Sequence, residues 1–284
     1  LSRLDEGKVA FGLSVDMDAV QVKPGETRWG QQVALLAQPP QEALSHWAEW
    51  VARTHRARTD KGALWGWNSW SFHGMNVSGK DVLAEVAAVL NSERRLRPAV
   101  MEIDHGYRDA KGRQGLSEKF AEGLDYYAAR IASTGARPGL FINFKGPPGF
   151  SNICEHVRTA VKAGFTDIKI KQTFLTLPRD SVPVKTSFET MREGFAMIRK
   201  ASGEGTYLLY NAGRHDRATV GFVDASRSGL GTTVSQSAMP FLMPCAPFTS
   251  MAAGSLSIAI PTTWARISRM SAKSRAGGPW CGRG

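Results

Sequence analysis

The chain has 284 residues, of which 42% are hydrophobic and 21% are charged, a balance typical of a globular protein with a large core. Its formal net charge of +11 suggests a nucleic-acid partner. The excess lies largely beyond Asp224, however, where 60 residues contain no acid and lack the interleaved aromatic residues of a base-stacking surface. No run of about 18 apolar residues occurs. We therefore expect neither a nucleic-acid partner nor a membrane span.

The three cysteines, Cys154, Cys245 and Cys281, are widely spaced and show no metal-ligand pattern. His105, His215 and Asp216 likewise lack a spacing such as His-x-x-x-His. We expect free thiols, a cytoplasmic location and no metal. The chain does not begin with Met, and its first residues lack the apolar segment of a signal peptide, so we interpret its start as internal to a longer protein or the result of processing. The oligomeric state stays open.

The first 40 residues have the pattern of short strands. Apolar alternation predicts strands over 9–13, 20–22 and 32–36, and Pro24-Gly25-Glu26-Thr27 predicts a turn. These are too few strands for a complete sandwich, so residues 1–40 are interpreted as the end of a β-sandwich domain. Residues 41–60 follow as a connecting segment, in which an apolar and aromatic stripe predicts a helix over 41–58.

A βα series predicts that residues 61–244 form a barrel. Strands are expected over 63–67, 99–103, 139–143, 166–170, 206–210 and 221–223, with helices over 79–90, 116–133, 151–163 and 187–201. This series favours a (β/α)8 TIM-type barrel, incomplete at its carboxyl end. A doubly wound open sheet is the alternative, and it is disfavoured because no Gly-rich dinucleotide turn follows the first strand. Residues 245–284 show no periodicity and are interpreted as an irregular tail, with an altered reading frame as one hypothesis.

Polar groups at the carboxyl ends of these strands mark the expected site, because active sites of α/β barrels lie at that end. Lys169 and Lys171 are unusual there, since a buried cation is costly without an anionic partner. Either a carboxylate or an anionic ligand faces them, or one lysine has taken another residue's place. Further polar strand ends are Asn68-Ser69, Asp104-His105, Asn211 with Arg214-His215-Asp216, and Asp224-Ala225-Ser226-Arg227.

Five motifs resemble α-galactosidases of glycoside hydrolase family 36 and their relatives in clan D. They are Gly66-Trp67-Asn68-Ser69-Trp70, Ile103-Asp104-His105-Gly106-Tyr107, Gly135-Ala136-Arg137-Pro138-Gly139-Leu140-Phe141, Lys169-Ile170-Lys171 and Val223-Asp224-Ala225-Ser226-Arg227. The resemblance covers about residues 20–243. It implies a (β/α)8 barrel that hydrolyses α-galactosides with retention and needs no metal or organic cofactor.

The same resemblance exposes departures at both catalytic positions. The family's nucleophilic Asp matches Lys171, and its acid/base Asp matches Gly231. Its two adjacent sugar-binding acids match Asp104 and His105. Retaining hydrolysis needs two carboxyl groups about 5 Å apart, so the mechanism cannot run through Lys171 and Gly231. The expected substrate-binding residues are Trp67 as an apolar face for the sugar ring, together with Asp104, His105, Lys169 and Arg227.

Three interpretations follow. The chain is a diverged α-glycosidase of impaired activity, a sugar-binding barrel without catalysis, or an enzyme in which a displaced carboxylate (Asp216, Asp224 or Glu102) does the work. Asp224 is the best of these substitutes, although a salt bridge to a nearby arginine is the more common role for such a residue. Glu102 is set aside, because its direction depends on the regularity of its strand. An incomplete barrel exposes strand edges, so we also expect poor stability.

Overall fold

The computed structural model describes residues 2–3, 9–10, 14–30, 32–62, 64–108, 116–144, 150–172, 185–213 and 217–228. The expectations for Gly231, for His215 and Asp216 and for the tail 245–284 lie outside these residues.

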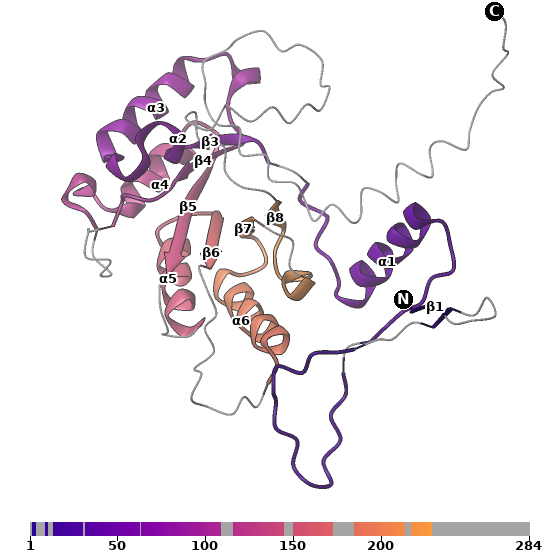
Figure 1. Ribbon diagram of the computed structural model, residues 1–284. Helices are drawn as coiled ribbons and strands as arrows, with labels where there is room; N and C mark the ends of the chain where they lie inside the picture. The colour runs from indigo at the N-terminus through magenta and orange to yellow at the C-terminus, as the bar shows by residue number, and fades with distance from the viewer. Residues whose placement is uncertain are drawn as a thin grey trace, which may run out of the picture.

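A sheet of six parallel strands forms the body of the molecule (Figure 1). The strands follow one another in chain order: β3 (Gly66–Asn68), β4 (Val100–Ile103), β5 (Arg137–Phe144), β6 (Asp167–Gln172), β7 (Tyr207–Gly213) and β8 (Ala225–Ser228). A doubly wound sheet reverses its strand order at a switch point, and this sheet does not. The described strands therefore form an incomplete barrel, which confirms the predicted fold class.

Helices connect the strands and cover the outer side of the sheet (Figure 1). They are α2 (Trp70–His73), α3 (Gly79–Asn91), α4 (Leu124–Ala132), α5 (Phe150–Lys162) and α6 (Ser187–Ser202). Capping boxes fix where two of them begin: Ser78 with Asp81 at α3, and Thr186 with Glu189 at α6. Each box satisfies backbone N–H groups that the first helical turn leaves unpaired.

Strand alternation divides the buried residues into an outer and an inner set. The outer set packs against the helices and forms the main core, which includes Met101, Ile103, Leu140, Ile142, Ile168 and Ile170. The inner set faces the barrel axis and has an apolar cluster beside β7 and β8, where Tyr207, Leu209 and Ala225 pack together with Leu64, while Phe141 is a buried apolar inner residue of β5. On β4 and β6 the inner positions are polar: Glu102, Asp167 and Lys169 are all buried. The buried ionisable side chains of β4 and β6 therefore face the barrel interior and not the helices.

The amino-terminal part agrees with the sequence only in places. The turn at Pro24 and Gly25 is present, closed by a hydrogen bond from Glu26 N to Lys23 O of 3.0 Å. The connecting helix is α1 (Pro40–Thr54). The pair β1 (Ser2–Arg3) and β2 (Val9–Ala10) is antiparallel. The strands expected over 20–22 and 32–36 are wrong, since these residues pair with no neighbouring strand in the described chain.

Two expected elements of the barrel are also corrected. The helix expected over 116–133 is a 3₁₀ turn (Glu118–Phe120) followed by α4, with Gly123 between them. The strand expected over 221–223 is part of a turn that follows the 3₁₀ helix Arg217–Thr219. The Arg192 side chain takes up the carbonyls of Ala218 and Val220, so this apolar run packs beneath α6 instead of joining the sheet. The sixth strand begins only at Ala225.

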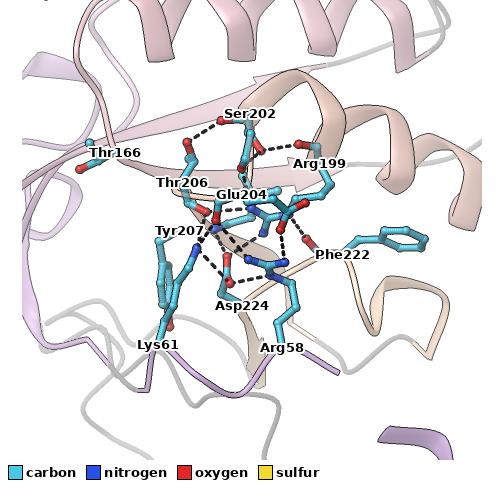
Figure 2. A network of polar contacts seen from close by, with 12 residues as sticks. Arg58, Lys61, Thr166, Arg199, Ser202, Glu204, Thr206, Tyr207, Phe222 and Asp224 are labelled. Carbon is cyan, nitrogen blue, oxygen red and sulfur yellow. Dashed lines mark hydrogen bonds and ion pairs between the residues drawn. The ribbon is translucent and has the colours of Figure 1, made fainter. Parts of the chain in front are cut away.

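Asp224, the residue before β8, forms the centre of an ion-pair network at the amino end of the sheet (Figure 2). Its carboxylate accepts hydrogen bonds from Leu208 N at 2.8 Å, Arg199 Nη2 at 2.7 Å and Arg58 Nε at 2.9 Å. Lys61 Nζ lies 3.4 Å away. Burial raises the pKa of Asp224, but the bonds from Leu208, Arg58 and Arg199 outweigh it and hold the pKa below its usual value. The network ties residues 58–61 to the starts of β7 and β8.

We predict that Asp224→Ala lowers the free energy of unfolding by about 3–5 kcal/mol, because it leaves the buried Arg199 guanidinium without its carboxylate. The Asp224 side chain is 1% exposed and that of Arg199 is 6% exposed. Because the folded-state pKa is lowered, the stabilisation is present above the unfolded pKa of about 3.9 and is lost as pH falls through the folded-state value.

Denaturant unfolding at pH 7 measures the effect. The matched control is Arg95→Ala, which removes an ion pair to Glu93 whose side chains are 77% and 65% exposed, and which should change stability by about 1 kcal/mol or less. Equal effects of the two substitutions would contradict a structural role for Asp224.

Candidate functional site

The candidate site is built around the ammonium group of Lys169, on the inner face of β6. Its Nζ donates to Glu102 Oε1 and to Asp104 Oδ2, each at 2.8 Å. All three side chains are 5–7% exposed. A buried ammonium requires such partners, because an unpaired charge in the interior is very costly. The two acids come from β4 and from the residue that follows it, so this contact joins two strands that are not neighbours.

Asn68, at the end of β3, closes the cluster from the other side. Its amide nitrogen donates to Asp104 Oδ2 at 2.9 Å and also to Glu102. Its amide oxygen accepts from Trp70 N at 2.8 Å. Ser69 adds a hydroxyl that accepts from Asp104 N at 2.9 Å. The motif from Asn68 to Trp70 therefore holds Asp104 in place through its side chains and its backbone.

The cluster separates the pKa values of its two acids. Burial raises the pKa of Glu102 to about 7, against the opposing effect of Lys169. Burial also raises the pKa of Asp104, but Lys169, Asn68 and the backbone N–H of His105 outweigh it, and the net pKa is lowered. For Lys169, burial lowers the pKa and the two acids more than compensate, so it is raised. At neutral pH Lys169 and Asp104 are both ionised. Glu102 is then present in both its protonated and its ionised form, because its pKa is about 7.

His105 lies beside this cluster, in the turn that follows β4. Its ring is between Trp70 and Phe141, with centroid distances of 5.6 Å and 4.5 Å. Its Nε2 is 3.4 Å from Asn143 Nδ2. The next residue, Gly106, has φ of +105°, and a Cβ there would come within 2.6 Å of the carbonyl oxygen of Met75. Glycine is therefore required for the turn that presents His105.

The cluster around Lys169 forms a lower row of polar side chains inside the barrel. An upper row lies two residues further along the strands, at the mouth. Alternation places Asn143, Lys171 and Arg227 on the inner face, two residues beyond Phe141, Lys169 and Ala225. Asn211 follows Tyr210, where the pairing of β7 with β8 becomes irregular, and its place in this row rests on its contact with Arg227. Asn143 and Lys171 are register partners on β5 and β6. Arg227 Nη1 donates to Asn211 Oδ1 at 3.1 Å, joining β8 to β7. The Lys171 side chain is exposed. The mouth of the described barrel thus carries two cations and two amides.

The structure brings most of the predicted site residues together at this edge of the sheet: Asp104, His105, Lys169, Lys171 and Arg227. Asp224 lies at the opposite, amino end, so its prediction as a substitute carboxylate at the mouth is corrected. Trp67 points to the outer side of its strand and packs against the main core, with its ring 6.4 Å from that of His73. The aromatic residue beside the site is Trp70, which is 40% exposed.

Sequence reasoning named Asn68 and Asn211 as polar strand ends without giving them a role, set Glu102 aside, and missed Asn143. Glu102 shares the parity of Asp104, and a regular β4 was the only signal that could have included it. Asn68 lies within a motif that was noticed, but its partners depend on the register between β3 and β4. The two amides end strands whose inner face only the three-dimensional structure defines.

Below the cluster, Asp167 is a buried acid inside the barrel. It is 3% exposed and lines a cavity of about 20 Å³ together with Asn68, Glu102 and Tyr207, which is room for about one water molecule. Burial raises its pKa to about 8, with a further contribution from Glu102, against opposing effects of Arg137 and Lys169. At neutral pH this acid is largely protonated in the folded protein.

No group of three or more His, Cys, Asp and Glu residues suited to a metal ion occurs in the described residues. Within the same residues, no helix is both long and apolar enough to span a membrane.

An incomplete parallel barrel with carboxylate, amide and cationic groups at its strand ends has the architecture of the glycoside hydrolase barrels. Comparison with solved structures finds the same fold. The fold matches the α-galactosidase from Thermus thermophilus in complex with stachyose, with a TM-score of 0.54 and 19% identity over 68% of this chain and 48% of that one. The same enzyme in complex with p-nitrophenyl α-D-galactopyranoside matches with a TM-score of 0.53 and 21% identity, over 68% and 46% of the two chains.

α-Galactosidase I from Mortierella vinacea also matches, with a TM-score of 0.44 and 16% identity over 60% of this chain and 44% of that one. The sequence matches no protein-family model and no curated protein. The chain spans less than half the length of these solved structures. At this level of identity the comparisons establish the α-galactosidase-like fold, which the sequence motifs had predicted.

We predict that Asp167→Asn makes the protein more stable at pH 8 and flattens the decline in stability between pH 5 and pH 8. The folded state keeps a proton on Asp167 up to a pKa of about 8, whereas the unfolded state releases it near 3.9. The unfolded state binds fewer protons in this window, so stability falls as pH rises. Asn has no proton to lose and keeps the shape.

Urea unfolding of both proteins at pH 5, 6, 7 and 8 measures the difference in slope. Asp125→Asn, on the surface of α4, is the matched control and should leave the slope unchanged. A wild-type slope no different from that of Asp167→Asn would contradict a buried, protonated Asp167.

Proposed function

We propose that this chain binds a terminal α-galactoside or a related α-glycoside at the mouth of the barrel, and that retaining two-carboxylate hydrolysis is impaired. The observation that carries this proposal is the position of Lys171. It is exposed on the inner face of β6, one residue pair beyond the Lys169 cluster, where the family resemblance implies the nucleophilic Asp.

The chemistry of the two substituted positions supports impaired catalysis. A lysine side chain cannot serve as the carboxylate that attacks an anomeric carbon, and the glycine matched to the acid/base position has no side chain to give a proton. General acid–base catalysis alone contributes about 10²- to 10⁴-fold. Loss of both groups at once removes the nucleophile and the acid that the retaining mechanism requires.

The groups around the mouth support binding of a sugar. Asp104 Oδ2 is occupied by Asn68 and Lys169, while Oδ1 accepts from His105 N at 2.7 Å and keeps a lone pair for a hydroxyl. Asn143 and Asn211 add amide groups to the same edge of the sheet. The half-exposed ring of Trp70, held against His105, supplies an apolar face on which the C–H groups of a pyranose can pack.

We predict that Trp70→Ala weakens binding of methyl α-D-galactopyranoside by about tenfold, because an aromatic contact contributes about 0.5–1.5 kcal/mol. Isothermal titration or ligand-observed NMR measures the affinity. Phe72→Ala is the matched control, since Phe72 belongs to the same helix and is 54% exposed, but its ring packs against His73. The control should change the affinity by less than about twofold. Equal losses for both variants would contradict a role for Trp70 in the site.

A second candidate is hydrolysis by Glu102 and Asp104, favoured by their separated pKa values. A protonated acid beside an ionised one is the pattern of an acid/base pair. Both acids, however, bind the same ammonium and lie on one strand and its end, whereas glycosidase carboxyl groups flank the scissile bond. We therefore keep this as the alternative that activity measurements decide.

Turnover of an aryl α-galactoside separates the two candidates, because its good leaving group needs little acid assistance. We predict no turnover above background by the chain as it stands, and measurable turnover by the double variant Lys171→Asp, Gly231→Asp. The single variant Lys171→Asp is the matched control for recovery of the nucleophile alone. Turnover by the unmodified chain that Glu102→Gln abolishes would establish the second candidate and contradict the first.

A further inference from the structure

We infer that the sugar bound at the mouth carries an anionic group, a carboxylate or a phosphate, and that Lys171 and Arg227 bind it. This inference rests on the proposed function and names the class of ligand for the same site. It follows from the charges that line the two inner rows of the barrel.

The charges of the lower row, formed by Lys169 with Asp104 and Glu102, are paired within the protein itself. Within the described residues, Lys169 has Asp104 and Glu102 as partners, each at 2.8 Å. The acids in turn are buried and hydrogen-bonded to Asn68. While Glu102 is protonated, the single charges of Lys169 and Asp104 cancel and this row presents no net charge to a ligand above it.

The positive charges of the upper row, Lys171 and Arg227, are not paired in this way within the described residues. Within the described residues, neither Lys171 nor Arg227 forms an ion pair, and the hydrogen-bond partner of Arg227 is the neutral amide of Asn211. A lysine in place of the nucleophilic Asp that the family resemblance implies changes the local charge by two units. Both cations lie at the mouth, so their charges add over the place where a ligand binds.

The spacing of the two cations suits a sugar with a charged substituent. They lie on β6 and β8, separated only by β7, so their backbones are about 10 Å apart. Both residues lie on the inner face, so a pyranose ring with one anionic group between them is within reach of both long side chains. Arg227 offers a planar fork to two oxygen atoms, and Lys171 offers a compact charge. The amides Asn143 and Asn211 lie beside the two cations, Asn143 as the register partner of Lys171 and Asn211 in contact with Arg227.

A neutral galactoside fits this row less well. Closing a ligand over two cations removes water from them, and nothing in a neutral sugar replaces the lost solvation with an opposite charge. An anionic group compensates both cations at once. Lys171, whose presence removes the nucleophile of the retaining mechanism, thus contributes affinity for an anionic sugar.

Titration calorimetry of the full chain in about 50 mM salt tests the inference with four ligands. These are methyl α-D-galactopyranoside, the corresponding methyl α-D-galacturonoside, galactose 6-phosphate and inorganic phosphate. We expect at least one anionic sugar to bind ten times more tightly than the neutral one, and its affinity to fall as salt increases. The anionic sugar that binds more tightly identifies the group as carboxylate or phosphate.

Lys171→Gln should weaken the anionic sugar about tenfold and leave methyl α-D-galactopyranoside within about twofold. Arg227→Gln should also weaken the anionic sugar about tenfold. Lys200→Gln is the matched control, with the same change of charge on an exposed residue in the last turn of α6, and it should alter neither affinity. An unchanged unfolding midpoint shows that the variants fold.

Equal affinities for the neutral and anionic sugars, unaffected by Lys171→Gln, would overturn the inference and leave the proposed function intact. Inorganic phosphate as tight as galactose 6-phosphate would overturn it differently, by showing a bare anion site with no sugar recognition. Failure of every sugar to bind would overturn both the inference and the proposed function.

Discussion

One buried contact, the Lys169 ammonium between Glu102 and Asp104, sets the arrangement of the site. It spans from β6 to β4 across β5, and the intervening strand has to leave room for it. Gly139 on β5 does so, since a Cβ there would come within 3.1 Å of the Cα and Cβ of Glu102. The next inner residue of β5, Phe141, has its ring centroid 5.2 Å from Lys169 Nζ. Phe141 and Gly139 on β5 thus leave room for the contact between Lys169 on β6 and the acids of β4. This contact fixes the three strands relative to one another.

Such a contact is a weak source of stability. Removing two acids and an ammonium from water costs several kcal/mol per ion, and well-packed apolar side chains in the same volume are often as stable or more so. The inner face near β7 and β8 demonstrates the apolar solution within the same barrel, with Tyr207, Leu209 and Ala225 packed together. Stability alone therefore does not account for the polar inner face of β4 and β6. Its position directly beneath the mouth is consistent with a role in holding Asp104 for a ligand.

The sequence predicted an element correctly where a local apolar pattern defines it. Prediction failed where contacts with residues distant in the chain define the structure. Alternation found β4 to β7 within a few residues, because their outer residues are buried under helices. It placed the sixth strand at 221–223, although the Phe222 carbonyl accepts a hydrogen bond from Arg199 and the strand begins at Ala225. That small shift moved Asp224 from the amino end of the sheet to the mouth. A shift of one residue in parity likewise separates Trp67, which faces the core, from Asn68, which faces the site. The charge partners of Lys169 depend on register across three strands, which no local pattern encodes.

The two inner rows differ in how strongly the fold constrains their charge. At the Lys169 level, a reversed or unpaired charge would be buried and would cost several kcal/mol, so the fold fixes the identity of all three groups together. Lys171 is exposed, and water solvates a cation or an anion at that position nearly equally well. The folded structure therefore tolerates Lys or Asp there, and stability does not choose between them. Under the proposed function the ligand distinguishes the two residues, because attack on an anomeric carbon requires the carboxylate and binding of an anionic sugar favours the ammonium. The charge at Lys171 therefore bears on the proposed ligand and not on the fold.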